Sequence, residues 1–166
     1  MIDFNLTEVY IALGSNMGDR NQNLEDACRF IESSAGKIIK RSSVYETEPW
    51  GFHQQPDFFN QTIKIETTFA PDRLMKELLA IEENMGRIRT FKNASRVIDI
   101  DILFYGDRII NNEHVTIPHP SLEKRKFVLI PLNEIAPELI HPVRKKSVGE
   151  LLLECMDPLK VERVGV

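Results

Sequence analysis

The stretch SRVIDIDILFYG, at residues 95–106, constrains the fold more than any other part of the chain. Its β-branched and aromatic residues favour a strand, and residues two apart on a strand point to the same face. The isoleucines at alternate positions would therefore face a core, while Asp99 and Asp101 share the opposite face. Burying an ionised carboxylate without a partner is costly, so a positive charge must meet these two side chains.

The rest of the chain places this strand in a β-α-β-β-α-β order. The expected strands are residues 8–13, 37–47, 60–68 and 96–105. Apolar residues at helical spacing predict one helix ending at Gly36 and another beginning at Pro71. This order predicts an α+β fold with a ferredoxin-like core, a mainly antiparallel sheet and helices on its faces. Helices expected around residues 127–135 and 148–155 would form a C-terminal helical extension.

Length and composition narrow the class of protein. The 166 residues contain no repeat or linker, so we expect a single domain over residues 1–166. A net charge of −4 argues against nucleic-acid binding. Charges interrupt every stretch long enough to span a bilayer, so no membrane partner is expected. Without a recognisable signal peptide, and with only Cys28 and Cys155 as cysteines, the expected compartment is the cytoplasm.

The carboxylate pair fits a magnesium site. Two like charges so close together raise each other's pKa unless a cation lies between them. Magnesium prefers hard oxygen ligands and completes its shell with water and substrate phosphates. The alternative is that each aspartate pairs with an arginine such as Arg96 or Arg125. We favour the metal, because a rigid strand carrying paired carboxylates is a suitable platform for one.

The loop before this strand is basic although the whole chain is acidic. Arg87, Arg89, Lys92 and Arg96 fall within ten residues. Arginine recognises phosphate oxygens through two hydrogen bonds at once, so a basic loop beside a metal site suggests a polyphosphate ligand. Without the aspartates, a solvated surface loop would be the better interpretation.

Large aromatic side chains gather between the second and third expected strands, close to Asn60. They are Trp50, Phe52, Phe58 and Phe59, and Phe127 follows Arg125 later in the chain. Core packing explains any one ring. Several rings beside an amide could instead hold a flat heterocycle by stacking and hydrogen bonding.

Two short motifs read as turns. GSNMG, at residues 14–18, lacks the spacing and the lysine of a phosphate-binding P-loop, so it is expected to be a tight strand-to-helix turn. His119 lies between two prolines, where a turn residue is usual and a phosphate contact is the alternative.

The motifs together resemble a known family. YIALGSN, SSVYETEPWG, QPDFFNQ, GRIR, SRVIDIDILFYG, TIPHP and PLNEIAPELIHP follow one another from Tyr10 to about Pro142. In this the chain resembles the hydroxymethyl-dihydropterin pyrophosphokinases of folate biosynthesis. The resemblance implies transfer of the β,γ-pyrophosphoryl group of ATP to the hydroxymethyl group of 6-hydroxymethyl-7,8-dihydropterin, with release of AMP. It also implies two Mg²⁺ ions bound by Asp99 and Asp101, and a monomer acting on small molecules.

The resemblance assigns roles to individual residues. Arg87 and Arg96 match the family's catalytic-loop arginines. The nucleotide-contacting positions are matched by Arg89, Ile102, Thr116, His119 and Arg125. Phe58 and Phe127 match the two rings that sandwich the pterin, and Asn60 matches the amide that reads its edge. The backbone around Thr47 and Glu48 lines the same pocket, with Trp50 beside it.

The chain also departs from the family pattern. Many members have Trp-Gly-Pro-Arg just before the aspartate strand, whereas this chain has Asn93, Ala94 and Ser95 in a loop one residue shorter. Pro120 stands where many members have an aromatic residue. These differences bear on how the loop closes over the substrates. Two other functions compete with this one: a different Mg²⁺-dependent phosphotransferase or phosphohydrolase, and a non-catalytic ferredoxin-like nucleotide-binding module.

Overall fold

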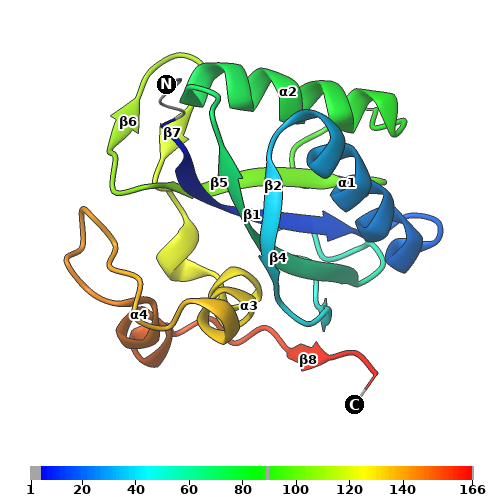
Figure 1. Ribbon diagram of the computed structural model, residues 1–166. Coiled ribbons are helices and arrows are strands. Elements are labelled where there is room, and N and C mark those ends of the chain that lie inside the picture. The colour runs from blue at the N-terminus through cyan, green and yellow to red at the C-terminus, as the bar shows by residue number, and fades with distance from the viewer. Residues whose placement is uncertain (1–4, 89, 166) are drawn as a thin grey trace.

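A computed structural model describes residues 5–88 and 90–165 of the chain (Figure 1). Its strands are β1 (Thr7–Ser15), β2 (Lys37–Arg41), β3 (Tyr45–Thr47), β4 (Phe58–Thr67), β5 (Asp99–Tyr105), β6 (Ile110–Asn111), β7 (Thr116–Ile117) and β8 (Val161–Arg163). Its α-helices are α1 (Arg20–Ser34), α2 (Pro71–Asn84), α3 (Lys126–Ile135) and α4 (Val148–Glu154), with a 3₁₀ turn at Leu122–Lys124.

The main sheet is antiparallel. Its strand order is β5-β1-β4-β3-β8, and β2 also pairs with β4. β6 and β7 form a separate two-stranded hairpin. The order β5-β1-β4, with β2 and β3 both paired to the far side of β4, confirms the predicted ferredoxin-like core.

The two faces of the sheet carry separate apolar clusters. α1 and α2 cover one face, and α3 and α4 lie on the other (Figure 1). The first cluster contains the buried stripes of α1 and α2 together with Ile98, Ile100 and Ile102. The second cluster joins α3 and α4 to Leu103 and Phe104 of β5. The predicted inward direction of the isoleucines is therefore confirmed.

Local sequence signals explain where the helices begin. Asp19 precedes α1, and its carboxylate accepts a hydrogen bond from the backbone N–H of Gln22. α2 begins at Pro71, which has no N–H to leave unpaired. Ser147 and Glu150 form the expected capping box at the start of α4.

One expected strand is divided in the structure. Residues 37–47 form β2 and β3, separated by residues 42–44, instead of one continuous strand. The Ser42 hydroxyl accepts the backbone N–H of Thr62, and the Gln61 amide donates to the Ser42 carbonyl. Side chains thus replace part of the backbone ladder there. The short strand β8, which pairs with β3, was not predicted from the sequence.

An irregularity in β5 determines what each half of that strand faces. Ile102 pairs with Ile11 and Phe104 pairs with Tyr10, which leaves Leu103 as an extra residue between the two pairs. Such a β-bulge lets neighbouring residues face the same side. Leu103 and Phe104 both belong to the second cluster, whereas Ile100 and Ile102 belong to the first.

Candidate active site

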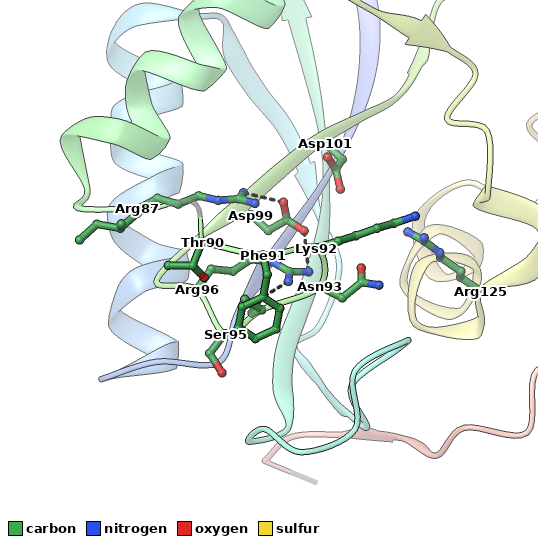
Figure 2. A pocket seen from close by; sticks show the side chains of 12 residues that line it. Arg87, Thr90, Phe91, Lys92, Asn93, Ser95, Arg96, Asp99, Asp101 and Arg125 are labelled. Atoms are coloured by element: carbon green, nitrogen blue, oxygen red, sulfur yellow. Dashed lines mark hydrogen bonds and ion pairs between the residues drawn. The ribbon is translucent and has the colours of Figure 1, made fainter.

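The carboxylate pair lies at the start of β5. Asp99 pairs in register with Gly14, and Asp101 pairs with Ala12. Ala12 and Gly14 also line a small cavity that contains both carboxylates in its wall. Figure 2 shows Asp99 between the side chains of Arg87 and Arg96, with Asp101 further along the strand.

Asp99 is fully engaged by two arginines. Arg87 Nη1 lies 2.8 Å from Asp99 Oδ1, and Arg96 Nη2 lies 3.2 Å from Asp99 Oδ2. Burial alone would raise the pKa of this carboxyl group, but the charges of Arg96 and Arg87 outweigh burial and lower it. For Asp99, the alternative of an arginine partner therefore holds in the structure.

Asp101 differs from Asp99 in its surroundings. It makes no hydrogen bond or ion pair with any residue that the structure describes. Burial, together with the negative charges of Asp99 and Glu82, outweighs the positive charges of Arg96 and Arg125 and raises the pKa of Asp101 to about 8. A partly buried carboxyl group in this condition is a ready ligand for a cation that arrives from outside the chain.

Glu82 on α2 bonds both the basic loop and the start of β5, a role that was not predicted from the sequence. Its side chain is 3% exposed and accepts hydrogen bonds from Arg87 Nη1 at 2.7 Å and from the backbone N–H of Ile100 at 2.7 Å. The signal in the sequence is an acidic residue next to the apolar stripe of a helix. Glu82 thereby fixes both the basic loop and β5.

A polar cavity of about 450 Å³ opens between the basic loop and the aspartates (Figure 2). The residues that line it are Arg87, Ile88, Thr90, Phe91, Lys92, Asn93, Ala94, Ser95, Arg96, Asp99, Asp101 and Arg125. Four of these are cations and two are carboxylates, so the cavity offers positive charge to an anion and oxygen ligands to a metal.

A narrower slot of about 30 Å³ adjoins the open cavity. Its lining brings together the predicted heterocycle-binding residues: Thr47, Glu48, Trp50, Phe58, Asn60 and Phe127, with Asn93, Arg96, Asp99 and Arg125. Asn60 Nδ2 donates to Thr47 Oγ1 at 2.6 Å. A Cβ atom on Gly14 would lie 2.7 Å from Asn60 Oδ1, so only glycine leaves the amide in this position.

Two guanidinium groups line the slot beside its aromatic rings. Arg96 lies 4.7 Å above the Phe58 ring, and Arg125 lies 4.4 Å above the Trp50 ring and 5.7 Å from the Phe127 ring. The Nε atoms of both arginines are buried without a hydrogen-bond partner among the described residues. Leaving a buried donor unpaired is costly, so both side chains gain by moving toward an anionic ligand.

Side-chain contacts tie the basic loop to the aromatic loop. Gln55 Nε2 donates to the Asn93 carbonyl at 2.6 Å, and Gln55 Oε1 accepts from Asn16 Nδ2 at 2.8 Å. The Phe52 and Phe91 rings meet edge to face at 5.3 Å. Asn16 belongs to the GSNMG motif, for which the sequence predicts only a turn. Its side-chain amide also connects the two loops, a role that the sequence does not indicate.

The predicted nucleotide-contacting residues are only partly gathered. His119 lines a small cavity with both aspartates and Arg125, and burial together with the charge of Arg125 lowers its pKa. The Ile102 side chain is buried in the first apolar cluster. Thr116 is exposed on β7, which packs against β5 at the edge of the sheet. Arg89 lies outside the described residues.

The fold and the site define an α+β protein that places paired carboxylates, a basic loop and an aromatic slot side by side. Residues 10–137 match the model of the 7,8-dihydro-6-hydroxymethylpterin-pyrophosphokinase (HPPK) family. The chain belongs to this family.

Full-length relatives support the assignment. The chain is 41% identical to 2-amino-4-hydroxy-6-hydroxymethyldihydropteridine pyrophosphokinase of Aquifex aeolicus, over 87% of this chain and 90% of that protein. It is also 41% identical to the protein of the same name from Haemophilus influenzae, over 89% of this chain and 92% of the other.

Other relatives are much longer. The chain is 41% identical to folic acid synthesis protein fol1 of Pneumocystis carinii, but it spans only 20% of that protein's length. A crystal structure of Plasmodium falciparum HPPK-DHPS with pterin and p-hydroxybenzoate superposes with a TM-score of 0.72 at 20% identity, over 90% of this chain and 42% of that one. This structural likeness supports the fold alone.

Two features of the described residues bear on the expected partners. No helix there is both long and apolar enough to cross a bilayer. No group of three or more histidine, cysteine, aspartate or glutamate side chains in that part of the chain is arranged to hold a metal ion. A metal at Asp99 and Asp101 would therefore need ligands from water or substrate.

Proposed function

We propose that this protein transfers the β,γ-pyrophosphoryl group of ATP to the hydroxymethyl group of 6-hydroxymethyl-7,8-dihydropterin. The pterin hydroxyl oxygen bonds to the β-phosphorus while the bond from that phosphorus to the α,β-bridging oxygen breaks. AMP leaves with the bridging oxygen, and a proton is released. We further propose that residues 1–166 act as one domain and as a monomer.

One observation carries this proposal: the open basic cavity and the aromatic slot share Asp99, Asn93, Arg96 and Arg125 in their walls. A triphosphate in the cavity and a flat ring in the slot would meet at these residues. Phosphoryl transfer depends mainly on positioning and charge neutralisation, and such an arrangement supplies both.

Asp99 and Asp101 fit Mg²⁺, and we propose that they hold two ions. The support is Asp101, a partly buried carboxyl group with a pKa raised to about 8 and no ion pair among the described residues. Bound Mg²⁺ would neutralise charge on the triphosphate and orient it. The donor set of two carboxylates leaves room for phosphate oxygens and water.

The chain's own arginines would take up the remaining phosphate charge. Arg87 and Arg96 bond Asp99 in the free protein, and they could turn from it to phosphate oxygens. Arg87 would keep its bond to Glu82 during that exchange, which holds its guanidinium near the cavity. We propose the same phosphate role for Arg125 and for Arg89.

The slot would hold the pterin ring after its arginines have moved. At about 30 Å³ it has room for one water molecule, far less than a bicyclic ring needs. Phe58 and Phe127 would then exchange guanidinium neighbours for the two faces of the pterin. Asn60 would present both an oxygen and an N–H group to the pterin edge.

The test is AMP release from ATP and Mg²⁺, with and without hydroxymethyl-dihydropterin. We expect AMP and the pterin diphosphate in equal amounts, and only when both substrates are present. AMP formed equally well with an unrelated alcohol would indicate a different phosphotransferase. ATP binding without any AMP would indicate a nucleotide-binding module.

A further inference from the structure

The segment Met156–Arg163 contacts both sides of the slot. It follows α4 and ends in β8, which pairs with β3 so that Val161 lies opposite Thr47. Glu48 donates its backbone N–H to the Lys160 carbonyl at 3.2 Å, and the Lys160 N–H donates to Glu48 Oε1 at 2.6 Å. The wall that carries Thr47 and Glu48 is therefore held by this segment along its outer edge.

Asp157 connects the same segment to the opposite wall. The residue is 8% exposed, and its Oδ2 accepts the backbone N–H of Lys126 at 3.0 Å while its Oδ1 accepts that of Leu159 at 3.0 Å. α3 begins at Lys126 and has no side-chain cap from Arg125, the residue before it. Asp157 thus caps a helix from outside, one residue ahead of Phe127.

Electrostatics favour the same arrangement. Positively charged residues at a helix N-terminus oppose the helix dipole, and α3 opens with Arg125 and Lys126. The carboxylate of Asp157 offsets that charge at the first turn. It thereby fixes the turn from which Arg125 and Phe127 reach the slot.

The segment contributes little to the core. Met156 is 91% exposed, and Asp157 is the only one of these eight described residues that is buried. Hydrophobic stabilisation scales with the apolar area removed from water, so little of the fold's stability can come from here. Its polar contacts are instead concentrated on the two walls of one cavity.

We propose that Met156–Arg163 is a positioning element that sets the separation of the two walls of the pterin slot, with Asp157 as its positioning residue. Asp157 touches no substrate and acts through Phe127 and Arg125. The inference rests on the proposed function for the identity of the ligand. It extends that function to a segment beyond residue 137, where the match to the family model ends.

The first test is Asp157→Ala, with pterin and ATP affinities measured separately by titration calorimetry. We expect pterin binding to weaken about threefold to tenfold, the range for a lost helix cap, and ATP binding to change by less than about twofold. Asp157→Asn keeps one acceptor oxygen and should restore part of the affinity. The matched control is Glu154→Ala. Glu154 lies three residues before Asp157, and its replacement removes an exposed ion pair with Lys146.

The second test compares two shortened chains. Ending the chain after Leu159 removes β8 and the bonds to Glu48, whereas ending it after Val164 keeps them. We expect weaker pterin binding only for the shorter chain, with both chains folded by circular dichroism. The single tryptophan, Trp50, lines the slot and gives an independent fluorescence signal of its geometry.

The outcomes separate this inference from the proposed function. Wild type that binds pterin but makes no AMP overturns the proposed reaction, while the binding comparison still tests the segment. Unchanged pterin affinity in both Asp157→Ala and the shorter chain overturns the inference. Equal losses of pterin and ATP affinity, or failure of the shorter chain to fold, also overturn it, because the segment would then act on the whole fold.

Discussion

One face of the sheet contains two very different regions built by the same strands. Under α3 and α4, β1 and β5 place Tyr10, Leu103 and Phe104 in a buried apolar cluster. Further along the same two strands, Gly14 and Asp99 lie in the walls of open or polar cavities. The difference follows from the helices, because α3 covers one half of this face and its first turn only borders the other.

The comparison shows that packing of a helix against a strand determines whether its side chains there are apolar or charged. In the covered half, each side chain is fixed by its neighbours and contributes to stability. In the open half, arginines neutralise one of the two carboxylates, and a cavity beside them is large enough for a ligand. We therefore expect changes in the covered half to alter stability and changes in the open half to alter activity.

Phe104→Ala should have the largest effect, and it should be an effect on stability. The ring is 1% exposed and packs edge-on against Tyr10 and His141. Removing a buried phenylalanine ring costs about 3–5 kcal/mol of unfolding free energy. Urea unfolding measures this loss, and Leu153→Ala, at 88% exposure, is the control. A large rise in the KM for pterin in Phe104→Ala would contradict the division between a region that serves stability and a region that serves activity.

Asp99→Asn and Asp101→Asn should both lower turnover by about 10²–10³-fold, the usual effect of removing a group that positions charge. Their effects on the stability of the metal-free protein should have opposite signs at neutral pH. Asp99→Asn loses two arginine bonds and should lower the melting temperature. Asp101→Asn removes a partly buried carboxyl group that makes no ion pair with the described residues, and it should raise the melting temperature.

The pH dependence sharpens this contrast between the two aspartates. Asp101 has a pKa raised from 3.8 to about 8, so its contribution to wild-type stability is complete below about pH 4 and is lost as the pH rises to 8. Asp99 has a lowered pKa, so its contribution is present above about pH 4 and is lost in acid. The advantage of Asp101→Asn should therefore grow from pH 5 to pH 8. An advantage that stays constant over this range would contradict the raised pKa.

Arg87→Ala and Arg96→Ala should slow the chemical step by about tenfold to a hundredfold, because each removes one group that meets phosphate charge during transfer. Substrate affinities should change less. Single-turnover measurements separate the two quantities. Arg73→Ala is a matched control, since this arginine also stacks on a ring, Phe69, but lines none of the site cavities described above. Unchanged chemistry in both arginine variants would remove them from the catalytic residues.

Among the residues that line the cavity and the slot, Phe127→Ala and Asn60→Ala should have the smallest effect, a loss of pterin affinity of about tenfold with ATP binding nearly unchanged. Titration with each substrate measures this directly. Phe59→Ala is the control within β4, because its ring packs with the first apolar cluster and beneath Arg20. The slot assignment fails if both variants bind pterin like wild type, or if they lose pterin and ATP affinity equally.

Much of the fold follows from patterns that are local in the sequence. The periodicity of α1 and α2, the start at Pro71 and the capping box at Ser147 all appear in the structure. The division between β2 and β3 was missed because it depends on Ser42 bonding to Thr62, twenty residues later. β8 was missed for a related reason: it is a short strand with few apolar residues, and only pairing with β3 defines it.

Within the candidate site, the sequence by itself determined which side chains lie on the open face of β5 and that the loop before it is basic. Only the tertiary structure decided how those charges are shared. Asp99 acquires two guanidinium partners and Asp101 acquires none among the described residues, although both lie on the same face of one strand. The physical reason is that alternation along a strand fixes direction, whereas a charge is neutralised by whatever other elements bring close to it. Here those elements are α2 with Glu82 and the loop that carries Arg87 and Arg96.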